Sequence, residues 1–174
     1  MLIFSLFLNS LYAGNWPAWR GEDATGSTDS GNYPIELNLK KNLLWKASLP
    51  DKGCSTPIVW QDSIFLTCPI NGEDGVLSFS LNGGKNWQTK IGLQRKGKHL
   101  NGSGSNPSLI TDGRNLYALF KSGNLACLNR GGEILWQKDL SSYGKDTLYW
   151  DFGTSPILSS KHVIVALMRK GNSW

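Results

Sequence analysis

Two short phrases recur along this chain, and their spacing limits the folds open to it. One is a tryptophan followed by lysine or glutamine, with an aliphatic residue four places after the tryptophan, at Trp45, Trp87 and Trp136. The other is a small polar residue before proline, at Pro57, Pro107 and Pro156. The prolines are 50 and 49 residues apart, and the last two each follow a tryptophan by 20 residues. Internal periods of this size are typical of solenoids, propellers and other repeat arrays.

Each period divides into four short apolar runs separated by glycine-rich turn signals. The runs cover 58–60, 64–66, 76–79 and 87–91 in the first period, and 108–110, 116–120, 125–128 and 134–136 in the second. No run shows the 3.6-residue apolar stripe of a helical repeat. Four strands joined by tight turns form an antiparallel sheet with two faces to cover, and radial stacking of like sheets covers both. We therefore predict an all-β fold, a β-propeller of four-stranded antiparallel blades.

The repeat also predicts a domain plan. The propeller segment spans 43–174, with a closing strand at 43–49 and, after it, blades at 56–91 and 106–140 and a partial blade at 155–174. The closing strand precedes the first full set of four, as expected of a strand that completes the last blade and removes a free sheet edge. We therefore expect an N-terminal segment of about two and a half blades from a propeller of roughly seven or eight.

The repeated tryptophan has a place in this plan. It begins each fourth, outermost strand, where its ring can pack between neighbouring sheets and bury about 200 Å². We therefore predict a structural blade-docking role for Trp45, Trp87 and Trp136. Stacking of these rings on a ligand is the alternative, which we disfavour because a radial repeat needs a bulky residue at each joint.

The N-terminus resembles an export signal. Residues 1–12 are almost wholly apolar and Ala13-Gly14 follows them, a pattern typical of a signal-peptide core and cleavage site. We predict a signal peptide at 1–13, an N-terminal extension at 14–42 and a periplasmic or otherwise extracytoplasmic location. The apolar run lacks a preceding positive charge, so a true start upstream of Met1 and a buried N-terminal strand stay open. No other apolar run is long enough to cross a bilayer, so no transmembrane span is expected.

Charge and cysteine content exclude two further classes. The net charge is +5, but the basic run at 95–98 is short and has no interleaved aromatic residues, so we expect a solvated loop and no nucleic-acid partner. The three cysteines have no C-x-x-C spacing and imply no zinc site. Cys54 and Cys68 lie near the open end of a predicted hairpin, where a disulfide and separate thiols, Cys127 among them, both stay open.

At residues 126–136, ACLNRGGEILW, the sequence resembles the docking motif of the PQQ-like β-propeller repeat family, which includes the outer-membrane assembly factor BamB. In that motif Ala and Gly precede the tryptophan by ten and four places. The first blade has Leu77 at the Ala position and Gly83 at the Gly position. The resemblance covers most of 15–174. It implies the propeller fold and says little about function.

The family name raises the question of a quinone cofactor. The resemblance implies that quinoprotein dehydrogenases of this fold use adjacent cysteines, a calcium ion and an aspartate base. This sequence has no adjacent cysteines, and its closest calcium-like run, 71–75, lacks the alternating ligand spacing. Neither His99 nor His162 has a nearby nucleophile in a catalytic pattern. We therefore assign no catalytic, metal or cofactor-binding residue, expect no cofactor, with PQQ unsupported by this segment, and disfavour an enzyme.

Two long connections remain, at 92–106 and 141–155. They follow equivalent outer strands, so blade geometry places them on one face of the propeller, and loops on rigid scaffolds often carry function. Packing of Trp150 beneath its own loop is the alternative to recognition. The candidate partner-binding residues are Arg95, His99, Asn101, Tyr149, Trp150 and Asp151.

Two functions follow from these observations. The first is an exported, non-catalytic propeller scaffold that presents the loop face to a protein, peptide or glycan and otherwise contacts the remaining blades of its own propeller. The second is the N-terminal part of a PQQ-dependent or other periplasmic oxidoreductase. Adjacent cysteines and carboxylate ligands elsewhere in the full-length protein would favour the second.

Overall fold

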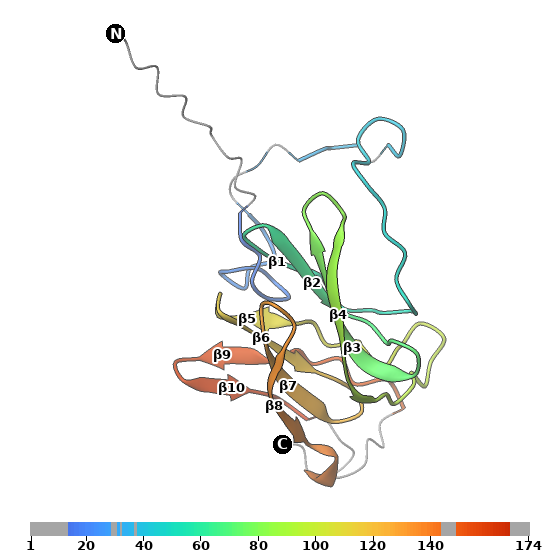
Figure 1. Cartoon of the computed structure of the whole chain (residues 1–174), viewed down its shortest axis with the longest axis vertical. Coiled ribbons are helices and arrows are strands. Elements are labelled where there is room, and N and C mark those ends of the chain that lie inside the picture. The colour runs from blue at the N-terminus through green and yellow to red at the C-terminus, as the bar shows by residue number, and fades with distance from the viewer. Residues whose placement is uncertain (1–13, 29–30, 32, 37, 144–148, 168–174) are drawn as a thin grey trace.

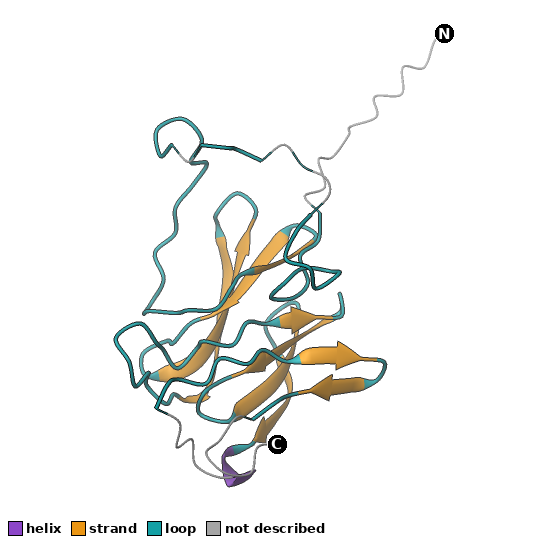
Figure 2. Ribbon diagram, turned by 180° about the vertical axis from the view of Figure 1, so that it is seen from behind, coloured by secondary structure: helices purple, strands orange, loops and turns teal. Residues whose placement is uncertain are grey.

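Three antiparallel sheets make up the protein in a computed structural model that describes residues 14–28, 31, 33–36, 38–143 and 149–167 (Figure 1). The first contains, in spatial order, β1 (Ile58–Trp60), β2 (Ser63–Thr67), β3 (Glu73–Ser80) and β4 (Lys85–Leu93). The second contains β5 (Ile110–Thr111), β6 (Asn115–Leu119), β7 (Asn124–Asn129) and β8 (Ile134–Asp139). The third pairs β9 (Ile157–Ser159) with β10 (His162–Ile164), and a 3-10 helix, η1 (Ser141–Tyr143), follows β8 (Figure 2).

The predicted all-β architecture of four-stranded antiparallel blades is confirmed, whereas most strand bounds differ from the predicted apolar runs, for example at β3, which begins at Glu73 instead of 76. β5 begins at Ile110 instead of 108, because the backbone amide of Ser108 donates to Oγ of Ser155 at 2.9 Å and not to a neighbouring strand. β10 ends at Ile164. Residues 43–49 form no strand, since the described part of the chain offers them no strand to pair with.

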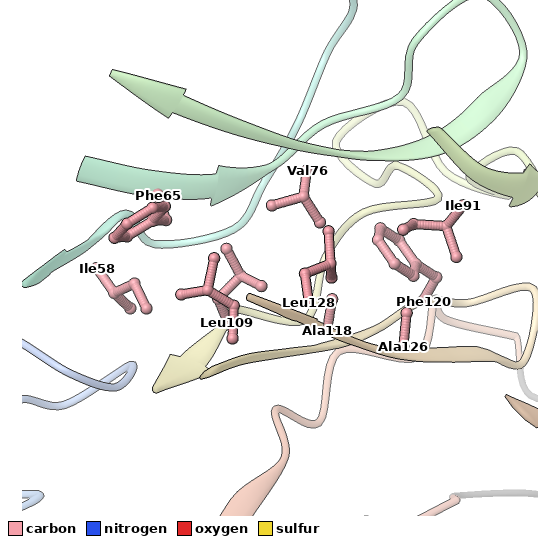
Figure 3. Close-up of a cluster of buried hydrophobic side chains, with 10 residues drawn as sticks. Ile58, Phe65, Val76, Ile91, Leu109, Ala118, Phe120, Ala126 and Leu128 are labelled. Atoms are coloured by element: carbon pink, nitrogen blue, oxygen red, sulfur yellow. The ribbon is translucent and has the colours of Figure 1, made fainter. Parts of the chain in front are cut away.

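The core lies between the two four-stranded sheets. Strand alternation sends one set of side chains from each sheet into this space, where they meet in one buried cluster (Figure 3). Burial of each large aliphatic or aromatic side chain there contributes about 1.5–3 kcal/mol. The cluster consists of Ile58, Phe65, Val76, Ile91, Leu109, Leu116, Ala118, Phe120, Ala126 and Leu128, with Trp60 and Trp87 packed against it.

Two of the repeated tryptophans lie on a glycine turn of the next unit. Nε1 of Trp87 donates to the carbonyl of Arg130 at 3.0 Å, and a Cβ atom on Gly132 would come within 2.7 Å of the indole. Gly132 also has a φ of 90°, which favours glycine. Trp45 has the same arrangement, because its Nε1 donates to the carbonyl of Leu81 at 2.7 Å and its ring lies against Gly83.

The N-terminal extension contains a short arm that the sequence did not predict. Trp16 exchanges two backbone hydrogen bonds with Val59 of β1, at 2.8 and 2.9 Å. The next residue, Pro17, accepts a bond from the amide of Thr111 in β5 at 3.0 Å. The arm therefore pairs with the free edge of β1 and links it to β5, the first strand of the second sheet. The predicted signal peptide at 1–13 lies outside the described residues.

The three cysteines are separate free thiols. The thiol of exposed Cys54 donates to the carbonyl of Asn101 at 3.2 Å, and that of buried Cys68 donates to the carbonyl of Asp51 at 3.1 Å. Burial raises the pKa of both Cys68 and Cys127. Of the two alternatives that the sequence left open, the structure shows the unpaired thiols.

Candidate functional site

The two long connecting loops meet at one carboxylate. The first loop, 92–106, leaves β4, and the second, 141–155, leaves β8 and is described at 141–143 and 149–155. Asp151 in the second loop accepts hydrogen bonds from the backbone amides of Lys98 at 2.9 Å and His99 at 3.3 Å in the first. Equivalent loops of two repeats are therefore tied together in space.

A buried lysine, Lys121, holds this carboxylate in place. Lys121 lies in the turn between β6 and β7 with a fully buried side chain, and its ammonium pairs with Asp151 and donates to the carbonyl of Lys96 at 2.8 Å. Burial alone would raise the pKa of Asp151, but the bonds from Lys121, Lys98 and His99 outweigh it and hold that pKa below its usual value. Asp151 is therefore ionised at neutral pH. Removing either partner would leave an uncompensated buried charge.

Close packing around the carboxylate leaves no room for a side chain at Gly102. A Cβ atom there would overlap Oδ2 of Asp151. Asn106, at the end of the same loop, donates from Nδ2 to the carbonyl of Phe152 at 3.3 Å. Phe152 is buried with Leu119 and Leu125, so it anchors the second loop to the second sheet. Asp151 and Phe152 are thus part of the loop framework.

Three aromatic rings stand on this framework and form what we call the aromatic cluster: His99, Tyr149 and Trp150. The ring centroids of His99 and Trp150 are 5.2 Å apart at an interplanar angle of 62°, and those of Tyr149 and Trp150 are 4.9 Å apart at 88°. Such edge-to-face contacts order aromatic rings relative to one another. Trp150 is 63% exposed and Tyr149 is 78% exposed. Trp150 therefore does not pack beneath its loop, and Phe152 takes that place.

The side chains of the other two predicted site residues are not part of the cluster. The backbone amide of Asn101 donates to Nδ1 of His99 at 3.2 Å, so Asn101 orients the imidazole through its main chain. Arg95 is exposed and lines a different hollow, beside Ser122 and Asp139. The structure thus brings together His99, Tyr149, Trp150 and Asp151 of the six predicted residues.

A polar recess, which could not be predicted from the sequence, adjoins the aromatic cluster. It has a volume of about 270 Å³ and opens beside His99. Lys52, from the segment before β1, and Lys96, from the first loop, line it. No local sequence pattern distinguishes Lys52 and Lys96 from solvated lysines. Lys121 likewise lies in a segment whose sequence is typical of an ordinary turn.

A second buried carboxyl lies between the two sheets. Asp74 in β3 is fully buried, and its Oδ2 accepts hydrogen bonds from Ser122 and, at 2.9 Å, from Nδ2 of Asn124. Its Oδ1 has no hydrogen-bond partner among the described residues. Burial, opposed only in part by these bonds, raises the pKa of Asp74 from 3.8 to about 6. At neutral pH this junction therefore contains a poorly solvated negative charge.

The described residues do not fit a quinone or a metal site. They contain no group of three or more His, Cys, Asp or Glu side chains arranged to hold a metal ion, and the cysteines are far apart along the chain, at 54, 68 and 127. Over the same part of the chain, no helix has the length and apolar character needed to cross a bilayer. We derive no chemical step through a cofactor from this geometry.

Comparison with known proteins agrees with the architecture. The sequence profile of a family described as outer membrane protein assembly factor BamB matches residues 33–171, whereas none of the curated proteins searched matches. A europium-containing methanol dehydrogenase is structurally similar, with a TM-score of 0.61 and 15% identity over 88% of this chain and 27% of its own.

A quinohemoprotein alcohol dehydrogenase, ADHIIG from Pseudomonas putida HK5, is similar over 70% of this chain and 18% of its own, with a TM-score of 0.50 and 18% identity. The chain thus spans less than a third of the length of either structure. At these identities the similarity shows the fold.

Proposed function

We propose a binding function from one premise: the chain belongs to the PQQ-like β-propeller repeat family, described as outer membrane protein assembly factor BamB. In this proposal the protein is a non-catalytic scaffold outside the cytoplasm, and its loop face binds a protein, peptide or glycan. The apolar segment at 1–12 and the name of the family support the location. The domain plan of signal peptide, extension and propeller segment is part of the same proposal.

One observation supports the binding function: exposed aromatic rings lie over a buried ion pair, Lys121 with Asp151, which we call the frame. Trp150 and Tyr149 are exposed, while the side chains of Lys121 and Asp151 beneath them are 0% and 5% exposed. Large exposed aromatic residues on a rigid support are the usual anchors of binding surfaces, because little conformational entropy is lost on binding. The frame supports the rings, and the rings contact the partner.

The repeated tryptophans serve the scaffold in this proposal. The hydrogen bonds of Trp45 to Leu81 and of Trp87 to Arg130, each beside a turn glycine, support a structural docking role. Trp136 is 37% exposed on β8 and would have this role toward the remaining blades of the propeller.

The test separates binding from folding in the full-length protein. The wild type and the double variant His99→Ala/Trp150→Ala are immobilised and exposed to an extracytoplasmic extract of the native host, and captured protein and glycan are compared. We expect the double variant to lose capture and to keep its melting temperature, since exposed contact residues affect binding and not stability. Tyr143→Ala, which removes an exposed tyrosine from η1, is the matched control and should capture normally.

The opposite result would contradict the proposed binding function. If the double variant melts at a much lower temperature while its folded fraction captures as well as the wild type, these rings only support their loops.

An oxidoreductase is the second candidate, favoured by the similarity to two dehydrogenase structures. Its chemistry would depend on residues outside the described part of this chain. Titration of the full-length protein with PQQ and Ca²⁺, followed by fluorescence and by dye reduction with a primary alcohol, tests it. Stoichiometric PQQ binding with turnover would favour the enzyme over the scaffold.

A further inference from the structure

The recess beside the aromatic cluster is small and polar. At about 270 Å³ it falls just below the range of roughly 300–1,000 Å³ typical of pockets for drug-sized ligands, which suits one ring of a longer ligand. Gln94 and Ser103 contribute hydrogen-bonding groups to its wall. His99 lines the recess and also contacts Trp150. The recess and the aromatic cluster are therefore one continuous surface.

The charges at the recess favour an anion. Its lining includes Lys52 and Lys96 against a single carboxylate, Asp51. The ammonium of Lys52 is already held by the carbonyl of Leu100. The side chain of Lys96 is exposed and, within the described part of the chain, forms no ion pair, while its own carbonyl is fixed by Lys121. Lys96 thus offers a positive charge on a fixed backbone.

The aromatic cluster favours a sugar over a peptide. The face of an indole carries negative charge density and attracts the weakly positive C–H bonds on one side of a sugar ring. Two common modes of binding an extended peptide use a free strand edge or a proline-binding groove lined by aromatic rings. The recess is lined by residues that lie outside the strands, before β1, after β2 and after β4, and the ring planes of Tyr149 and Trp150 are at 88° to each other. Neither peptide mode fits this geometry.

We propose that the ligand of this surface is an acidic oligosaccharide, with one sugar ring stacked on Trp150 and a carboxylate of a neighbouring ring beside Lys96. The inference rests on the proposed binding function and specifies its ligand class. Recognition combines the stacking, which any sugar ring satisfies, with the charge contact, which only an acidic sugar satisfies. Selectivity therefore depends on Lys96 and affinity depends on Trp150.

The test compares sugars that differ only in charge. Calorimetric titrations of the full-length protein use α-1,4-linked tetragalacturonate, its carboxyl-reduced counterpart tetragalactose, and tetraglutamate as a charged peptide. We expect tetragalacturonate to bind at least about fivefold more tightly than tetragalactose in low salt, with a preference that declines as salt is added. Tetraglutamate should bind weakly.

Three variants assign the two contributions. Lys96→Gln should remove most of the preference for the acidic sugar and leave tetragalactose binding unchanged. Trp150→Ala should weaken both sugars by about tenfold or more. Lys161→Gln, at an exposed lysine in the turn between β9 and β10, is the matched control and should change neither. Melting curves verify that each variant is folded.

Each contrary result overturns the inference in a distinguishable way. Equal affinities for the two sugars, both dependent on Trp150, would leave the binding surface intact and remove the acidic ligand class. Tetraglutamate binding as tightly as tetragalacturonate would assign the surface to acidic peptides. If neither sugar binds, the ligand class is wrong, and the capture experiment alone decides whether the binding function stands.

Discussion

β4 and β8 are the same strand in two successive repeats, and their surroundings differ. Each is the fourth strand of its sheet, with a tryptophan near its start. On β4, Trp87 is half-buried and packs against the core cluster that the second sheet completes. On β8, all six residues are exposed, and Trp136 contacts only Tyr117 of its own sheet among the aromatic rings described. The comparison shows that the next sheet, and not the strand itself, determines whether this tryptophan is buried.

The largest expected effect compares the two tryptophans directly. Trp87→Ala should lower the free energy of unfolding by about 3–5 kcal/mol, because it opens a cavity between two packed sheets and removes the bond to Arg130. In the 174-residue chain, whose described residues place no sheet over β8, Trp136→Ala should cost about 1 kcal/mol or less. Chemical denaturation of both variants measures the difference. Equal losses would show that β8 is covered as β4 is.

The second prediction concerns pH at the β3–β7 junction. Folding raises the pKa of Asp74 from 3.8 to about 6. A carboxyl with a raised pKa favours the folded state while protonated, so its contribution is fully present below about pH 4 and is lost as pH rises through about 6. The corresponding loss is about 2–3 kcal/mol.

The variant Asp74→Asn isolates this contribution. Between pH 4 and pH 7, the free energy of unfolding of the wild type should fall by about 2–3 kcal/mol more than that of this variant. Denaturant titrations across that range measure the difference. Asp62→Asn, at a side chain that is 85% exposed, is the control and should follow the wild type. Parallel curves for Asp74→Asn and the wild type would contradict the assignment. One repeat later the equivalent position is Gly123, so the effect belongs to this junction alone.

The smallest effect concerns one hydroxyl on β4, that of Thr89, which has no counterpart on β8. Oγ1 of Thr89 donates to the carbonyl of Gly132 at 2.7 Å across the junction, and the equivalent residue on β8 is exposed Lys138. Thr89→Val keeps the shape and removes the donor, so it should cost about 1 kcal/mol. Lys138→Ala should stay within about 0.5 kcal/mol of the wild type. A neutral Thr89→Val would mean that water replaces this bond.

The strands could be predicted from sequence because their signals are local. Short, mostly apolar runs at 76–79 and 125–128, with glycines at the turns, indicate where strands lie without reference to distant residues. The extended segment at 43–49 has the same local pattern and forms no strand, because pairing requires a partner. Local pattern determines the tendency to form a strand, and tertiary contacts determine the outcome.

The candidate site could be predicted only in part. Its loops follow from the repeat register, and the exposed aromatic residues follow from their loop positions. The buried ion pair of Lys121 and Asp151 that supports the rings could not be predicted. The two residues are 30 residues apart, and nothing in the sequence near either of them signals a buried ion pair. Asp74 was missed for the same reason, because its partners Ser122 and Asn124 belong to the next repeat.

The N-terminal arm has a consequence for the order of folding. Trp16 pairs with Val59, 43 residues later, and Pro17 bonds to Thr111, 94 residues later. Contacts between residues so far apart in sequence close large loops, and they form late because that entropy is lost before the contact is gained. During synthesis the arm leaves the ribosome well before either partner strand. Its docking therefore follows assembly of both sheets. In a hydrogen-exchange experiment, protection of the Thr111 amide, which donates to the carbonyl of Pro17, would report the moment at which the arm joins the two sheets.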